Sequence, residues 1–113
     1  MVLNDPPYGT ERTYNGLRLA HNLLRTTEGA EVTVFLMGDA AAAARTGQHT
    51  PNGYYNLERM LKGILTQGGT VLLCGSCMDA RGLREADVVE GSRRSSLDEL
   101  TRLTAAAEKV LVF

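Results

Sequence analysis

The stretch Val71-Leu72-Leu73-Cys74 is short and apolar, and no polar residue interrupts it. Residues 32–37 (VTVFLM) have the same character, with one threonine inside the run. Continuous apolar runs of this length, rich in β-branched residues, are typical of strands that are buried on both faces of a parallel sheet. These two stretches therefore predict the central strands of the domain.

Weaker signals extend the predicted sheet outward from this pair. Residues 110–113 form a further apolar run, residues 2–4 suggest a short first strand, and residues 88–89 suggest a brief fourth strand. The predicted helices lie between the strands and are marked by apolar periodicity, alanine content or capping signals. They cover residues 11–25, 39–45, 54–67 and 78–83, and a last helix begins at Ser96, where Ser96 and Glu99 fit a capping box.

The order of these elements predicts the fold class. Strands alternate with helices along the chain, and right-handed crossovers then produce a parallel sheet covered by helices on both faces. The sequence thus predicts one α/β domain over residues 1–113, with a five-stranded parallel sheet.

Composition excludes several classes of protein. The 113 residues include 12 basic and 13 acidic side chains, and the sequence pI is about 6.1, which argues against a broad nucleic-acid-binding surface. The longest apolar runs, residues 32–37 and 40–44, fall well short of the roughly 20 residues of a membrane-spanning helix. Residues 1–7 show no secretory signal, so we expect a cytoplasmic protein with neither nucleic acid nor a membrane as its partner.

Ligands of parallel sheets bind beyond the carboxyl ends of the strands, and the most informative loop there is Cys74-Gly75-Ser76-Cys77. A C-x-x-C sequence at a strand-to-helix turn indicates thiol chemistry, because exposed amides at a helix start stabilise a thiolate. Arg81, one turn further on, would add a positive charge. The two thiols could close a reversible disulfide, pass a sulfur atom between them, or form half of a zinc site whose other ligands would come from His21 and His49 or from another subunit. They could equally be inert, since cysteine is often buried for packing alone.

The loop between the first predicted strand and helix is a second candidate. Its rigid backbone would expose free helix amides to an anion, with Thr10 as the helix cap. It lacks the glycine patterns of nucleotide-binding loops, and an ordinary turn is the more common interpretation. The candidate pocket residues here are Asn4, Asp5, Tyr8, Gly9 and Thr10.

The loop over residues 47–55 is a third candidate because it carries His49, which could act as an acid, a base or a thiolate partner. An exposed loop histidine without a role is the more common case. His21 shares an apolar helix face with Leu17 and Leu24 and is expected to be structural. Arg93-Arg94 is interpreted as a solvated loop.

Several segments together resemble the DsrE/DsrF-like family of sulfur-relay proteins. They are residues 3–11 (LNDPPYGTE), 74–83 (CGSCMDARGL) and 109–113 (KVLVF), supported by Gly38-Asp39 and residues 51–58. The resemblance implies a three-layer α/β/α domain with a five-stranded parallel sheet of flavodoxin-like topology. It also implies homotrimers or homohexamers with active sites near the subunit contacts.

The same resemblance implies roles for the cysteines. In relay members the reactive cysteine follows the third strand and stands eight residues before a glycine, as Cys74 stands before Gly82. Cys74 would then carry a persulfide and Cys77 would resolve or accept the sulfur, although the two roles could be exchanged. A sulfurtransferase-like carrier of this kind needs no metal or organic cofactor, and its donor and acceptor proteins are not identified. The rival hypotheses are a thiol-disulfide redox protein and a module that binds an anion, a nucleotide or another protein.

Overall fold

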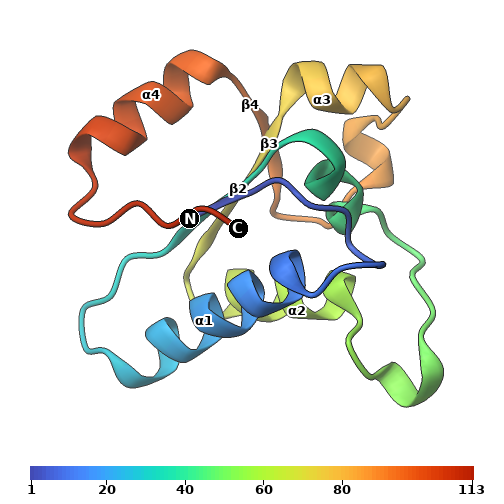
Figure 1. Ribbon diagram of the computed structural model, residues 1–113, viewed down its shortest axis with the longest axis horizontal. Helices are drawn as coiled ribbons and strands as arrows, with labels where there is room; N and C mark the ends of the chain where they lie inside the picture. Colours follow the sequence, from blue (N-terminus) through green and yellow to red (C-terminus); the bar gives the residue numbers. More distant parts are fainter.

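The computed structural model describes all 113 residues and shows an α/β fold built on a parallel sheet (Figure 1). The sheet has four strands in the order β1-β2-β3-β4, and each neighbouring pair is parallel. The strands are β1 (Val2–Leu3), β2 (Thr33–Leu36), β3 (Thr70–Cys74) and β4 (Arg93–Ser95). The two apolar runs are the inner strands β2 and β3, as predicted. The order differs from the 2-1-3-4-5 order of flavodoxin-like sheets.

The prediction of five strands is wrong, because residues 110–113 form only one isolated parallel bridge, between Val112 and Val2. Val2 donates its amide to the carbonyl of Leu111 at 2.7 Å, and Phe113 donates to the carbonyl of Val2 at 2.9 Å. The two ends of the chain therefore lie side by side (Figure 1). The amide of Asn4 also donates to the carbonyl of Phe113 at 2.8 Å, but only the Val2–Val112 pair forms a bridge, so these residues are not a fifth strand.

The position of the fourth strand was also predicted wrongly. Residues 88–89 are buried but form no strand, and Val88 makes only an isolated antiparallel bridge with Arg45. The strand is β4, whose Arg-Arg-Ser sequence has no apolar pattern. It is an edge strand paired only with β3, so its arginines reach solvent and pair with acidic side chains there.

The helices follow the prediction closely at α1 (Arg12–Thr26) and less closely elsewhere. Residues 39–45 were expected to be α-helical but form the 3₁₀ helix η1 (Gly38–Ala44). Short 3₁₀ turns also occur at η2 (Pro51–Gly53) and η3 (Glu85–Asp87). None of the helices is long and apolar enough to cross a membrane.

The remaining helices differ from the prediction mainly at their starts. The helix α2 (Leu57–Thr66) begins later than expected, because Tyr55 adopts a positive φ of 43° and Asn56 caps the helix through the amide of Arg59. The helix α3 (Gly75–Ala80) begins directly after Cys74 rather than at residue 78. At α4 (Leu97–Ala106) the Ser96 hydroxyl accepts a hydrogen bond from the amide of Glu99, as predicted. The Glu99 carboxylate does not close the capping box, because it accepts hydrogen bonds from Arg93 and Ser95.

Helices cover both faces of the sheet. On one face, α1 and α2 pack on alternate residues of the inner strands, including Val71 and Leu73 (Figure 1). On the other face, Leu72 and Cys74 join Phe35 in a smaller cluster that α4 covers. Because successive residues of a strand point to opposite faces, Cys74 lies on the side of the sheet that faces α4.

Candidate functional site

The two cysteines lie at the carboxyl end of the inner strand β3. Cys74 is the last residue of the strand and the cap of α3, and Cys77 follows within the first turn of that helix. Both thiols are free. Cys74 is only 8% exposed, whereas Cys77 is half-buried. The site therefore lies where ligands of parallel sheets bind, as the sequence predicted.

The surroundings of Cys74 favour its thiolate. Its Sγ atom lies 3.3 Å from the hydroxyl oxygen of Ser76. Burial raises the pKa of the Cys74 thiol, but hydrogen bonds from the Cys77 thiol, the Ser76 hydroxyl and the amides of both residues outweigh burial and leave this pKa below its ordinary value. Since α3 has only six residues, these individual donors matter more than a helix dipole.

The surroundings of Cys77 have the opposite effect, because they raise the pKa of its thiol. Burial and the neighbouring Cys74 raise the pKa of the Cys77 thiol, and the amide of Gly38, which donates to its Sγ at 3.2 Å, only partly offsets them. The directions of the two pKa shifts therefore favour ionisation at Cys74 before Cys77. The sequence did not predict the Gly38 amide as part of the site.

Arg81 was predicted to supply positive charge to a thiolate. In the structure its guanidinium binds Asp39 Oδ1 through two nitrogens, at 2.6 and 3.1 Å, and donates to the carbonyl of Cys77 at 3.0 Å. Its charge is thus largely compensated by Asp39. Arg81 ties α3 to η1, and of the two thiols it acts on Cys77.

Arg94, which the sequence interpretation placed in a solvated loop, lies beside the site. Its guanidinium packs directly on Gly75, where an added Cβ atom would come within 2.8 Å of Nε. The two Nη atoms each donate to a carboxylate oxygen of Asp79 at 2.7 Å, so Arg94 connects β4 with α3. This contact joins residues that are far apart in sequence, and the only local signal for it is the glycine that follows Cys74.

Replacing Gly75 with alanine is expected to displace Arg94 while leaving the fold intact, because the group that must move is the flexible end of a side chain. The hydrogen bond from Arg94 holds the pKa of Asp79 below its ordinary value, so this pKa should rise in Gly75→Ala. The stabilisation by the ion pair is therefore complete above the ordinary aspartate pKa and is lost as the pH falls through the lowered one. Carboxyl carbon NMR shifts followed against pH measure the effect. Arg94→Gln is the matched control and should raise the Asp79 pKa in the same way; an unchanged midpoint in Gly75→Ala alone would contradict the proposed contact.

The loop before α1 is closed by its own contacts. Thr10 was expected to cap α1, but Glu11 occupies the cap position without a side-chain hydrogen bond. The Thr10 hydroxyl instead donates to the Asp5 carboxylate at 3.0 Å, and Thr13 donates to the Asp5 carbonyl at 2.6 Å. Gly9 provides the positive φ of 100° that this turn needs.

Only one residue of this loop approaches the cysteine site. The carbonyl of Asn4 accepts a hydrogen bond from the amide of Ala40 at 3.2 Å. The same carbonyl lies beside Gly38, whose amide donates a hydrogen bond to Cys77. Tyr8 points elsewhere: its hydroxyl donates to Gln48, and its ring meets Tyr55 edge-on with a centroid distance of 6.2 Å. No hydrogen bond joins Asp5, Tyr8, Gly9 or Thr10 to either thiol.

Neither histidine is joined to the thiols. His49 is exposed and makes no hydrogen bond through its ring. Both ring nitrogens of His21 are engaged, Nε2 with the carbonyl of Met60 at 2.7 Å and Nδ1 with the side-chain amide of Gln67 at 2.8 Å, so the predicted structural role is confirmed. No three His, Cys, Asp or Glu side chains come together in an arrangement that could hold a metal ion.

The chain is similar to known proteins over its whole length. A profile of the DsrE/DsrF-like family matches residues 1–113. Protein YchN of Escherichia coli (strain K12) is 38% identical over 113 residues, covering 100% of this chain and 96% of that protein. The uncharacterized protein MJ0989 of Methanocaldococcus jannaschii is 34% identical with the same coverage.

Solved structures agree with these sequence matches. The crystal structure of the ychN protein from E. coli superimposes with a TM-score of 0.93 at 38% identity, covering 99% of this chain and 95% of that one. The protein of unknown function MTH1491 from Methanobacterium thermoautotrophicum shares the fold, with a TM-score of 0.79 at 15% identity and coverage of 99% and 94%. The full-length profile match and the 38% identity to YchN together show that the chain belongs to the DsrE/DsrF-like family.

Proposed function

We propose that the protein is a small sulfur carrier with sulfurtransferase-like chemistry, in which Cys74 holds a persulfide. The observation that carries the proposal is the set of hydrogen bonds that favours the Cys74 thiolate at the carboxyl end of β3 although the residue is buried. A thiolate is the form of cysteine that attacks sulfur. Membership of the DsrE/DsrF-like family supports the same chemistry.

The proposed reaction is a transfer of one sulfur atom without net oxidation. The Cys74 thiolate attacks the outer sulfur of a donor persulfide, the new bond forms between Cys74 Sγ and that sulfur, and the donor leaves as a thiolate. An acceptor thiolate then attacks the outer sulfur, and Cys74 leaves as a thiolate in turn. Neither step calls for a metal or an organic cofactor.

Cys77 is proposed to be the second thiol of this reaction. The Cys77 thiol lowers the pKa of Cys74, so it would stabilise the thiolate before the attack and again when Cys74 is the leaving group. Its position also allows it to accept the outer sulfur, in which case the Gly38 amide would stabilise the anion formed there. Asn4 and Arg81 hold the surrounding backbone in place.

The direct test is the intact mass of the reduced protein after exposure to glutathione persulfide. A gain of one sulfur atom that a reductant reverses is expected. A loss of two hydrogen atoms, from a disulfide between the cysteines with the persulfide reduced to glutathione and hydrogen sulfide, would favour a thiol-disulfide redox protein, which the two free thiols on one helix turn make the second candidate. An unchanged mass would contradict both and favour a binding module.

We further propose that the protein assembles into a homotrimer or homohexamer. Val110, Leu111 and Val112 are exposed, and a groove of about 1000 Å³ between α1 and α4 is lined mainly by apolar side chains, including Leu23 and Phe35. Uncovered apolar surface of this kind is typical of protein interfaces. Light scattering over a range of concentrations tests the proposal, and a monomer at every concentration would contradict it.

The charge of the chain bears on its expected partners. The near-neutral charge favours neither nucleic acid nor a membrane as a partner. We propose that the chain acts in the cytoplasm as one domain over residues 1–113. The sulfur donor and acceptor are expected to be other proteins or small thiols.

A further inference from the structure

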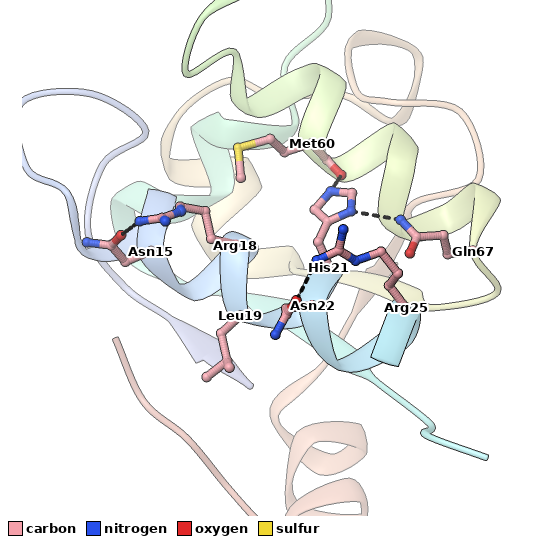
Figure 2. A pocket seen from close by; sticks show the side chains of 8 residues that line it. All are labelled: Asn15, Arg18, Leu19, His21, Asn22, Arg25, Met60 and Gln67. Carbon is pink, nitrogen blue, oxygen red and sulfur yellow. Dashed lines mark hydrogen bonds between the residues drawn. The ribbon is translucent and has the colours of Figure 1, made fainter. Parts of the chain in front are cut away.

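The helix α1 contains the same polar pattern twice. Asn15 and Arg18 are separated by two residues, and Asn22 and Arg25 repeat this spacing seven residues later. Seven residues are about two turns, or roughly 10 Å along the helix, so both pairs lie on one face. Figure 2 shows the two pairs with His21 between them.

Each arginine is held by the asparagine of its own pair. The guanidinium of Arg18 donates to Asn15 Oδ1 at 3.0 Å, and that of Arg25 donates to Asn22 Oδ1 at 2.8 Å. Arg18 also lies over the ring of Tyr14, 5.6 Å from its centroid. Both asparagine oxygens are thus occupied by the arginines. The polar groups of the two pairs that remain free for a ligand are N–H groups, which donate hydrogen bonds.

The two pairs line a groove of about 720 Å³ beside α2 (Figure 2). His21 forms its fixed centre, since its two ring nitrogens are bound to Met60 and Gln67 of the neighbouring segment. No acidic side chain lines the groove, and α1 contains no aspartate or glutamate at all.

The charges of Arg18 and Arg25 are also uncompensated. Six of the 12 basic side chains of the protein form ion pairs, and these two are not among them. An array of held cationic donors without a nearby carboxylate suits an oxyanion, which arginine binds through paired hydrogen bonds. Two such groups about two turns apart fit an extended anion better than a single small ion.

We propose that this groove binds a phosphate chain, either free or as part of a nucleotide. The inference rests on α1 and α2 and is independent of the cysteine chemistry. Arg18 and Arg25 would each bind phosphate oxygens, and the side-chain amides of Asn15 and Asn22 would donate to the same chain. The asparagines reduce the cost of binding because they already hold the arginines in place.

Titration with sodium tripolyphosphate at constant ionic strength, followed by the Nε–H signals of the arginines and the ring signals of His21, tests the proposal. We expect saturable shifts at Arg18 and Arg25, and affinity at least about tenfold weaker in the Arg18→Gln/Arg25→Gln variant, the loss that about 1.4 kcal/mol represents. The matched control is Arg45→Gln/Arg102→Gln, which removes two other arginines without ion pairs and should change affinity by less than about twofold.

ATP and adenosine form a second arm of the titration. Equal affinities for tripolyphosphate and ATP would indicate that the groove recognises the phosphate chain alone. A higher affinity for ATP would indicate that the ligand is a nucleotide. Both results support the proposal. Equal losses of affinity in the two double variants would overturn it in favour of general charge attraction. Shifts that do not saturate, or that chloride reproduces, would overturn it as well.

Discussion

Replacing Cys74 with serine should abolish the gain of sulfur from glutathione persulfide, lowering the rate by about a hundredfold or more. A serine hydroxyl is not ionised near neutral pH and cannot replace the thiolate as nucleophile. The hydrogen bonds from Ser76 and Cys77 that favour the thiolate would then have no anion to stabilise. Intact mass, recorded over time after addition of the donor, measures the loss.

Cys77→Ser is the matched variant and should still gain one sulfur. Serine provides a hydroxyl that can replace the Cys77 thiol as a donor to Cys74, and the Ser76 hydroxyl and the backbone amides are unchanged. We expect its loading rate to fall by no more than about tenfold, since one donor is altered and the nucleophile is kept. Ser76→Ala removes a different donor to Cys74 and should slow loading in the same direction.

The pH dependence of alkylation distinguishes the two thiols. In Cys77→Ser the rate should rise with pH through a midpoint below the ordinary cysteine pKa, because the remaining donors still lower the pKa of Cys74. In Cys74→Ser the midpoint of Cys77 should lie higher, because burial raises the pKa of Cys77. Sulfur loading that survives in Cys74→Ser and vanishes in Cys77→Ser would show that the roles are reversed.

The sequence predicted the centre of the sheet well and its edges poorly. Residues of β2 and β3 are buried on both faces, so burial alone selects a continuous apolar run. At the edge this constraint is absent: β4 consists of Arg93, Arg94 and Ser95 and is held by pairing with β3. Residues 110–113 show the converse, because an apolar run there pairs through a single bridge and stays largely exposed.

The same contrast holds at the candidate site. Cys74 and Cys77 were identified because their spacing and their place after a strand are local features of the sequence. The Gly38 amide that binds Cys77 lies 39 residues away, and Arg94 reaches Gly75 from a neighbouring strand, so neither contact leaves a periodic signal, and the glycine after Cys74 is the only local sign of the second one. His49 was a candidate by residue type, but it is exposed and makes no hydrogen bond to either thiol.

Leu73→Ala should cause a large loss of stability, lowering the free energy of unfolding by about 3 kcal/mol. Leu73 is fully buried in β3 and belongs to the main core, which α1 and α2 cover. Truncation removes the transfer free energy of the side chain and leaves a cavity that the strand, hydrogen-bonded on both sides, cannot close. Such a loss is a large share of the roughly 5–15 kcal/mol that stabilises a typical domain.

Urea denaturation measures the effect, and Leu97→Ala provides the control. Leu97 is 67% exposed at the start of α4, so its truncation should change the free energy of unfolding by less than about 0.5 kcal/mol. Equal effects of the two variants would contradict the placement of Leu73 in the core.

Leu73→Ala should also change the ionisation of Cys74, because Leu73 directly precedes this residue. A partly loosened strand should expose the buried thiol. Cys74 should then lose both the burial that raises its pKa and the fixed donors that lower it. Leu73→Ala is therefore expected to move the midpoint of Cys74 alkylation toward the ordinary cysteine value, whereas Leu97→Ala should leave it unchanged.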